Sequence, residues 1–398
     1  MSWKVSDPVS ERVKFIGLLK SGQRTVAGLC REFGICRTTA YKYVRRFEEE
    51  GLEGLKERSR APHVLPRQTT PEIRDLLIAA RKTHPTWGPR KLKAWLEDRT
   101  PSLELPYPST IGEILKGAGL VHPRRRRARP PRISSPATEV SRPNEEWNAD
   151  YKGQFLLGNG EYCFPLTVTD SFSRFLLQVR ALTSTAASEA HPIFEGTFRE
   201  FGLPLAIRTD NGSPFAGTGL GRLSSLSVWW IKLGIRPVRG RPHHPQDNGR
   251  HERMHRTLKA ETTRPPASED RGQQRLFEAF QREYNFDRPH EALEQKPPGR
   301  VYAASWRPYP QKIVPVEYPS HYEVRTVGSG GIFAWHCQPI FISKSLVGER
   351  IGLIEIEDGL WRVYFAHLEL GILDLERMKG LRTGKVYAMS PVAQRLQA

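Results

Sequence analysis

The segment 248–259, NGRHERMHRTLK, carries one carboxylate and two histidines at spacings that fit two different metal chemistries. His251, Glu252 and His255 match the H-E-x-x-H pattern, in which two histidines one helical turn apart bind zinc and the glutamate acts as general base. Glu252 could equally supply one oxygen ligand of a magnesium site, because Mg²⁺ prefers carboxylate and water oxygens. The two interpretations require different partners elsewhere in the chain.

Two further acids have the setting that a magnesium site needs. Asp150 lies in a predicted strand within EWNADYKGQFLL, and Asp210 closes a short predicted strand, LAIRTD. The intervals are 59 residues from Asp150 to Asp210 and 41 residues from Asp210 to Glu252. Three carboxylates brought by different elements to one end of a sheet could hold two Mg²⁺ ions beside a scissile phosphate.

Two other acids compete with this assignment. Asp247 is the nearest rival to Glu252, but it would lie in the loop before the helix, whereas Glu252 lies about one turn inside it. Asp170 precedes Ser-Phe-Ser-Arg, a sequence that favours a capped turn over a metal ligand. We therefore assign the site to Asp150, Asp210 and Glu252.

The surroundings of the H-E-x-x-H segment argue against a zinc peptidase. A zinc helix usually has an apolar back and a third protein ligand, whereas this helix is polar and cationic. Helical geometry places Glu252 on faces adjoining His255, Arg256 and Lys259. A metal-binding carboxylate flanked by donors to a DNA backbone suits phosphoryl transfer better than peptide hydrolysis. We predict that His255, Arg256 and Lys259 contact DNA.

The charge of the chain indicates a polyanionic partner. Its 398 residues contain 61 Lys and Arg against 43 Asp and Glu, which gives a net charge of +18. No apolar run approaches the ~18 residues of a membrane span, and the first residues lack a secretory signal, so the expected location is cytoplasmic. Four scattered cysteines predict reduced, mostly buried thiols.

The first part of the chain has the pattern of a helix-turn-helix. Apolar periodicity predicts helices over 10–20, 25–33 and 37–50, with Gly34 in the turn. A helical hairpin with a solvated basic face would give the same composition, but the order of the elements favours DNA binding. The third helix would present its polar residues to a groove, namely Arg37, Thr38, Thr39, Tyr41, Lys42 and Arg45.

A second helical unit and a basic linker follow. Thr70-Pro71-Glu72 predicts a helix start, and 70–121 suggests a second helix-turn-helix, possibly with a wing. Residues 122–145 are rich in Pro and Ser and read as a linker. It could be a solvated spacer, but beside helix-turn-helix units we expect its arginines to neutralise phosphates, namely Arg124, Arg125, Arg126, Arg127 and Arg129.

The rest of the chain predicts a mixed α/β domain and then a β-rich one. From 147 onward three strands precede an alternation of helix and strand, which is an RNase-H-like order, and the segment 283–302 closes this region. In that segment Asn285, Arg288 and His290 would fix the loop rather than contact DNA. Strand signals with glycine-containing turns from 318 to 374 predict a small β-barrel.

The segments WNADYKG, TVTDSFSR, IRTDNGSPF and DNGRHERMHRTLKAE resemble the core of bacterial insertion-sequence transposases with a retroviral-integrase-type D-D-E domain. The resemblance implies that Asp150, Asp210 and Glu252 are the catalytic, metal-binding triad. The second interval is longer than is usual in that family, and the loop FAGTGLGRLSSLSV accommodates the difference.

The expected division of the chain follows from these patterns. We predict a helix-turn-helix domain over 1–60, a second helical domain over 61–121, the basic linker over 122–145, an RNase-H-like integrase core over 146–305, and the β-barrel with its tail over 306–398.

The resemblance implies a DNA transposase that uses two Mg²⁺ ions, with Mn²⁺ as a substitute, to cleave transposon ends and transfer 3′ hydroxyls into target DNA. Its partners would be double-stranded DNA, as terminal inverted repeats and target, and further copies of itself, at least as a dimer, without a membrane. The alternative is a non-catalytic helix-turn-helix regulator that kept the transposase fold.

Overall fold

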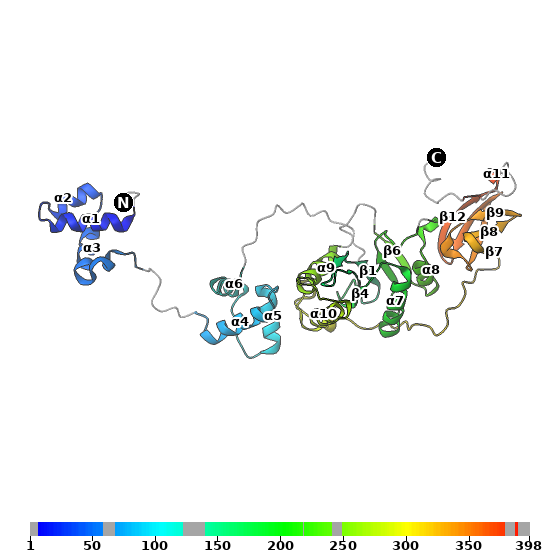
Figure 1. The fold of residues 1–398 in the computed structure, drawn as a ribbon, viewed down its shortest axis with the longest axis horizontal. Helices are drawn as coiled ribbons and strands as arrows, with labels where there is room; N and C mark the ends of the chain where they lie inside the picture. The colour runs from blue at the N-terminus through cyan, green and yellow to red at the C-terminus, as the bar shows by residue number, and fades with distance from the viewer. Residues whose placement is uncertain are drawn as a thin grey trace. The chain divides into compact units, whose positions relative to one another are not determined.

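The computed structural model of the 398-residue chain describes residues 7–58, 68–121, 140–217, 219–240, 249–378 and 387–388. Contacts divide the chain into two units, Met1–Thr70 and Pro71–Ala398. The elements of both units are labelled in Figure 1.

The first unit is a small three-helix domain. It consists of α1 (Pro8–Lys20), α2 (Val26–Phe33) and α3 (Arg37–Glu50), followed by a 3₁₀ turn at Gly51–Leu55. The side chain of Asp7 caps α1 by accepting hydrogen bonds from the first-turn amides of Val9 and Ser10. Gly34, with φ of 66°, ends α2 in the left-handed conformation that favours glycine. The predicted helix-turn-helix is therefore confirmed.

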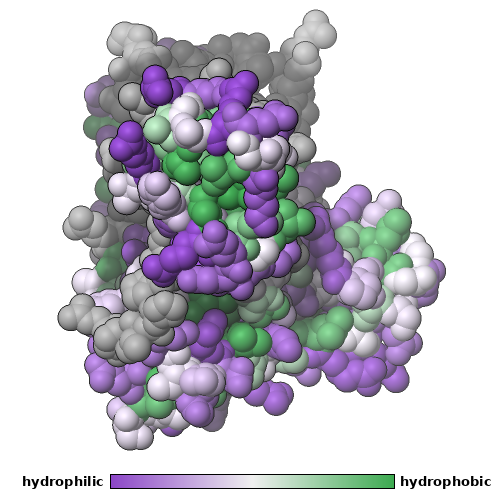
Figure 2. All heavy atoms as spheres, turned by 90° about the vertical axis from the view of Figure 1, so that its left-hand side faces the viewer, coloured by the Kyte–Doolittle hydropathy of each residue, from purple (hydrophilic) through white to green (hydrophobic). Residues whose placement is uncertain are grey.

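The outer face of α3 is polar, as expected from the sequence. Tyr43 and Ala40 are buried against Phe15 and Leu29, whereas the predicted groove-facing residues point outward. Of these, Thr39 is half-buried, and the exposed ones are Arg37, Thr38, Tyr41, Lys42 and Arg45. The unit also exposes the apolar residues Leu18 and Leu52. On the face of the molecule that Figure 2 turns to the viewer, hydrophobic residues form a group with hydrophilic residues around it.

The second unit begins with three short helices around a tryptophan. These are α4 (Pro71–Thr83), α5 (Pro89–Arg99) and α6 (Pro108–Gly117). Trp87 is fully buried among them, and the His84 ring stacks on it at 3.8 Å. Residues 68–121 are all described and contain no strand, so this region has no wing.

Helix α5 is tied to the rest of the second unit by ion pairs. Arg90 contacts Glu291 at 2.8 Å. Further along the helix, Arg99 contacts Asp287 at 2.6 Å and Asp98 contacts Arg300 at 2.7 Å. These pairs place α5 beside the segment that closes the α/β domain.

A mixed sheet forms the centre of the second unit. Its strands are β1 (Glu146–Tyr151), β2 (Phe155–Leu156), β3 (Tyr162–Asp170), β4 (Leu176–Leu182), β5 (Ala206–Thr209) and β6 (Arg236–Arg239). Strand β3 pairs antiparallel with both β1 and β4, while β5 pairs parallel with β1 and with β6. β2 pairs antiparallel with the start of β3. This is the mixed RNase-H-like sheet that the sequence predicted.

Helices cover both faces of the sheet (Figure 1). Helices α7 (Ala187–Phe201) and α8 (Ser225–Lys232) pack on one face around Trp147, Phe198 and Trp230. Helices α9 (Gly249–Thr262) and α10 (Asp270–Arg282) pack on the other, around Leu258 and Phe277. Because both faces are covered, the first four residues of β1 are all buried rather than alternating.

The C-terminal part is β-rich, as predicted. A four-stranded sheet has the order β12 (Leu368–Asp374), β11 (Leu360–Phe365), β10 (Arg350–Glu357) and β7 (Glu323–Thr326). A smaller sheet contains β8 (Ile332–Trp335), β9 (Gln338–Phe341) and β13 (Tyr387–Ala388), and α11 spans Leu375–Met378. The described strands form two sheets that are not closed, so the predicted barrel is not confirmed.

The C-terminal sheets share a hydrophobic core with the α/β domain. Leu223, Val228 and Ile231, which lie in and before α8, are buried in the same cluster as Phe333 and Leu370. The loop that lengthens the interval between Asp210 and Glu252 therefore ends in this shared core.

The structure also bears on the cysteines and on membrane-spanning helices. All four cysteines are free, but only Cys30 and Cys163 are buried, whereas Cys36 and Cys337 are exposed. Among the described residues, no helix has the length and apolar character required to cross a membrane.

Candidate active site

Asp150 and Asp210 lie at the same edge of the sheet. Asp150 is the fifth residue of β1, and Asp210 comes directly after β5. Because β1 and β5 pair parallel, their carboxyl ends meet at one edge of the sheet. Asp150 is partly buried and Asp210 is exposed.

Glu252 lies in the first turn of α9 and is exposed. The charges of Asp210 and Glu252 both act on Asp150. Burial is the largest cause that raises the pKa of Asp150 to about 7, the charge of Asp210 is the next, and the charge of Glu252 acts in the same direction. Lys152 opposes this shift. An acid held at such a pKa among other acids is a fitting site for a divalent cation, which would relieve their mutual repulsion.

The two histidines of α9 are anchored on the hydroxyls of β3. The Thr167 hydroxyl lies 2.7 Å from Nε2 of His251 and 2.7 Å from Nε2 of His255. It also donates to the carbonyl oxygen of Asp150 at 3.0 Å. A hydroxyl has a single proton, so both imidazoles must donate their Nε2–H to Thr167. Burial lowers the pKa of His251 to about 3 and depresses the pKa of His255 further, which keeps both rings neutral.

His255 is more buried than its predicted contact with DNA would suggest. The residue is only 5% exposed and its ring is bonded to Thr167, while it also lines the cavity beside Glu252, so the DNA contact stays a prediction. Its Nδ1 carries no proton in this tautomer and lies 3.8 Å from Oδ2 of Asp150. The sequence did not indicate Thr167 as the anchor, although histidines four residues apart facing a Val-Thr-x-Thr strand pattern were a possible signal.

The same contacts bear on the zinc interpretation. Ligand atoms of Asp150, His251 and His255 lie within 4.8 Å of one another, which is close enough for a shared ion. However, both ring nitrogens of His251 are already engaged, because Thr169 lies 2.8 Å from its Nδ1. A zinc ion on both histidines would have to displace a threonine from each. We therefore treat the two rings as structural supports for α9.

A cationic rim surrounds Glu252. A cavity of about 460 Å³ is lined by Lys152, Glu252, His255, Arg256, Lys259, Ala260 and Arg264. Arg256 and Lys259 are exposed, as predicted. The site thus combines clustered carboxylates with flanking positive charge, an arrangement suited to a phosphodiester substrate.

Two of the other residues singled out in the sequence stabilise a turn or a loop, and several lie outside the described residues. Asp170 accepts hydrogen bonds from the backbone N and hydroxyl of Ser173 at 2.7 and 2.6 Å, which confirms its turn-capping role. Asn285 bonds the backbone of Leu176 in both directions, so it fixes its loop as expected. Those outside the described residues are Asp247, Arg124, Arg125, Arg126, Arg127 and Arg129.

Comparison with known domain families covers most of the chain. Residues 11–63 match a helix-turn-helix domain, and 39–115 match a homeodomain-like domain. Residues 140–245 and 233–298 match integrase core domains, and 322–380 match the C-terminal domain of IS481 family transposases. These matches confirm the resemblance to insertion-sequence transposases that carry an integrase core.

Individual relatives agree with the domain matches. The Insertion element IS476 uncharacterized 39.2 kDa protein of Xanthomonas euvesicatoria is 25% identical over 258 residues, covering 64% of this chain and 71% of that protein. The Gag-Pol polyprotein of avian reticuloendotheliosis virus is 31% identical over 118 residues, covering 29% of this chain. The match spans only 10% of that viral polyprotein.

Two solved structures resemble parts of the chain. The HTLV-2 integrase catalytic core domain in complex with magnesium has 16% identity and a TM-score of 0.32, and the match covers 41% of this chain and 98% of that one. The simian T-cell lymphotropic virus intasome in complex with a PP2A regulatory subunit has 18% identity and a TM-score of 0.36, and the match covers 69% and 97%.

Proposed function

We propose that the protein is a DNA transposase that performs metal-dependent cleavage at transposon ends and transfers the freed 3′ hydroxyls into target DNA. The observation that carries the proposal is the electrostatic coupling of Asp150 to Asp210 and Glu252, which come from two strand ends and one helix. Acids from separate elements whose charges act on one another are the kind of metal ligands that a polynucleotidyl transferase needs.

The proposed cofactor is a pair of Mg²⁺ ions, for which Mn²⁺ would substitute. Asp150, Asp210 and Glu252 would hold them, and the donor set fits because all three offer hard carboxylate oxygens. When bound, the ions would lower the pKa of the attacking water or 3′ hydroxyl and stabilise the departing oxygen.

The remaining groups of the site would place the DNA. Lys152, Arg256 and Lys259 line the cavity that Glu252 faces, where they can neutralise the phosphates on either side of the scissile bond. Thr167 holds α9 against β3 through His251 and His255. The first turn of α9, which carries Glu252, is therefore fixed relative to Asp150.

The partners we propose are double-stranded DNA, as terminal inverted repeats and as target, and at least one further copy of the chain. The exposed polar face of α3 would bind the repeats, together with the arginines of the linker. We also retain the division into domains over 1–60, 61–121, 122–145, 146–305 and 306–398 as part of this proposal.

The test uses the full chain with oligonucleotide duplexes that carry the inverted repeats flanking its gene. The native chain should release a 3′ end and join it to a target duplex with Mg²⁺ or Mn²⁺ but not with EDTA. Asp210→Asn should bind the duplex equally and cleave nothing, because it loses a metal ligand. Glu200→Gln, at an exposed acid of α7, serves as the control and should behave as the native chain.

A non-catalytic DNA-binding regulator is the alternative function. It would bind the repeats through α3 without metal-dependent cleavage by either the native chain or Asp210→Asn. That result would refute the catalytic proposal and retain DNA binding.

A further inference from the structure

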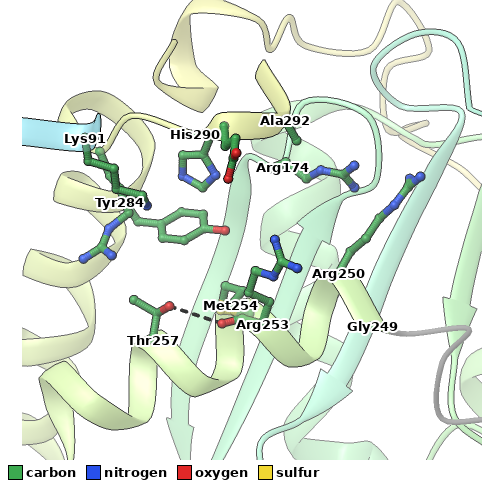
Figure 3. A pocket seen from close by; sticks show the side chains of 12 residues that line it. Lys91, Arg174, Gly249, Arg250, Arg253, Met254, Thr257, Tyr284, His290 and Ala292 are labelled. Carbon is green, nitrogen blue, oxygen red and sulfur yellow. Dashed lines mark hydrogen bonds between the residues drawn. The ribbon is translucent and has the colours of Figure 1, made fainter. Parts of the chain in front are cut away.

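A second cavity lies on the other side of α9 from the candidate active site. It measures about 450 Å³, and Figure 3 shows its walls. Four elements contribute to it: α5, the turn between β3 and β4, the first half of α9, and the segment 284–292. Its lining residues are Lys91, Arg174, Gly249, Arg250, Arg253, Met254, Thr257, Tyr284, Arg288, His290, Glu291 and Ala292.

The lining of this cavity, which we call the α5–α9 cavity, carries an excess of positive charge. Arg288 is neutralised by Glu261 and Glu283, at 2.6 and 3.1 Å. The acid in the lining, Glu291, pairs with Arg90 of α5.

The other three arginines of the lining differ from Arg288. Within the described part of the chain, no carboxylate lies at ion-pair distance from Arg174, Arg250 or Arg253, although the charges of Arg250 and Arg253 both act on Arg174. Like charges are thus held close together, and the charge of Asp170 opposes their effect on Arg174 without forming an ion pair.

The surroundings of these cations are partly dry. Burial and the charge of Arg288 lower the pKa of Lys91 to about 8. Burial and the charge of Arg250 lower the pKa of Arg174 to about 10. Desolvated cations would be stabilised by an anion, which supplies the opposite charge and hydrogen-bond acceptor atoms together.

The backbone at Arg174 points to the same conclusion. Arg174 has φ of 65°, in the left-handed region that residues with a side chain rarely adopt. A glycine would fit this turn with less strain, yet an arginine occupies it. Figure 3 shows the Arg174 side chain among those that line the cavity, near Arg250 and Arg253. Strained residues concentrate at ligand-binding positions.

We propose that the α5–α9 cavity binds a phosphodiester group of the DNA backbone. The inference rests on the proposed function for the presence of DNA, but it concerns a site distinct from the candidate active site, because Glu252 lines the other cavity. Lys91 comes from the second helical region, whereas Arg250 and Arg253 come from the helix that carries Glu252. A phosphate bound there would hold the DNA, α5 and the catalytic helix together.

The experiment compares three full-length chains in EDTA, so that cleavage cannot contribute. The test variant combines Arg174→Gly with Arg253→Gln, and the control is Arg275→Gln, an exposed arginine of α10 outside both cavities. Affinity for a duplex is measured over a series of salt concentrations. Thermal melting is expected to be unchanged, because relief at the left-handed position offsets the lost hydrogen bond from Arg174 to the Ser171 carbonyl.

We expect the test variant to bind the duplex about tenfold more weakly at low salt, with a salt slope smaller by about 1, since one phosphate is no longer neutralised. Hydrogen exchange should locate the effect. DNA should slow exchange of residues 284–292 in the native chain and in Arg275→Gln, and should not slow it in the test variant at saturating DNA.

Two results would overturn the inference. One is a test variant with the affinity, salt slope and exchange protection of the control. The other is protection of residues 284–292 by inorganic phosphate but not by DNA, which would make the cavity a small-anion site. The proposed function is judged separately, by cleavage: a chain that joins ends without protecting residues 284–292 loses this inference alone.

Discussion

Replacing Asp150 with asparagine should stabilise the metal-free protein while abolishing its catalysis. Burial and two neighbouring carboxylates raise the pKa of Asp150 from 3.8 to about 7, so the folded state disfavours its ionised form. The resulting destabilisation appears as the pH rises through the unfolded-state pKa near 3.8 and reaches its full size above about pH 7. Asparagine keeps the shape and removes the charge.

The size of the effect follows from the shift. A difference of about 3 pKa units corresponds to about 4 kcal/mol, and because 22% of the side chain is exposed, solvent screening reduces the expected gain to about 2–3 kcal/mol. We would measure the free energy of unfolding by urea titration with tryptophan fluorescence at pH 8 in EDTA. Glu200→Gln is the control and should change it by less than about 0.5 kcal/mol.

The gain of Asp150→Asn should disappear below about pH 4, where the carboxyl is protonated in both states. It should also shrink when Mg²⁺ is added, because the ion stabilises the native chain through a ligand that the variant lacks. A variant no more stable than the native chain at pH 8 in EDTA would refute the argument that the three carboxylates repel one another in the fold.

Three further substitutions test other parts of the structure. Thr167→Val removes the acceptor of two buried imidazole N–H groups, those of His251 and His255, and should cost about 2–5 kcal/mol of unfolding free energy by urea titration, most of which Thr167→Ser should restore. Asp170→Ala should cost about 2 kcal/mol in the same measurement through loss of its turn hydrogen bonds, without changing the Mg²⁺ affinity measured by calorimetry. Lys42→Gln should weaken duplex binding evenly across sequences and lower the salt slope by about 1.

Each of these expectations has a contrary result. A fully stable Thr167→Val would mean that the imidazoles find other partners. Loss of Mg²⁺ affinity in Asp170→Ala would move that carboxylate from the turn into the metal site. A sequence-dependent loss in Lys42→Gln would indicate a base contact instead of a phosphate contact.

The sequence predicted the parts of the fold that depend on local pattern. Helix α3 was predicted over its observed residues, and the glycine at the turn before it adopts the expected left-handed conformation. Strands β1 and β5 and helix α9 follow from alternation, Gly and Pro signals, and helical periodicity. The carboxylates could be assigned because strand ends and a helix start fix their positions.

The features that the sequence did not predict depend on contacts between segments far apart in the chain. His255 was expected to face DNA because helical geometry alone does not show that β3 places a threonine hydroxyl beneath it. The α5–α9 cavity needs Lys91 and Arg253, which are more than a hundred residues apart. Closure of the C-terminal strands is a question of pairing between sheets, which strand signals in one sequence cannot decide.

The loop after Asp210 and helix α8 limit where the protein can be truncated. Because Leu223 and the outer side of α8 are covered by the C-terminal sheets, a fragment ending near residue 305 would expose Val228 and Ile231 to water. Such a fragment would gain an exposed apolar surface that favours aggregation. Exchanging the C-terminal sheets between homologous proteins should therefore succeed only when this loop and the outer residues of α8 are exchanged with them.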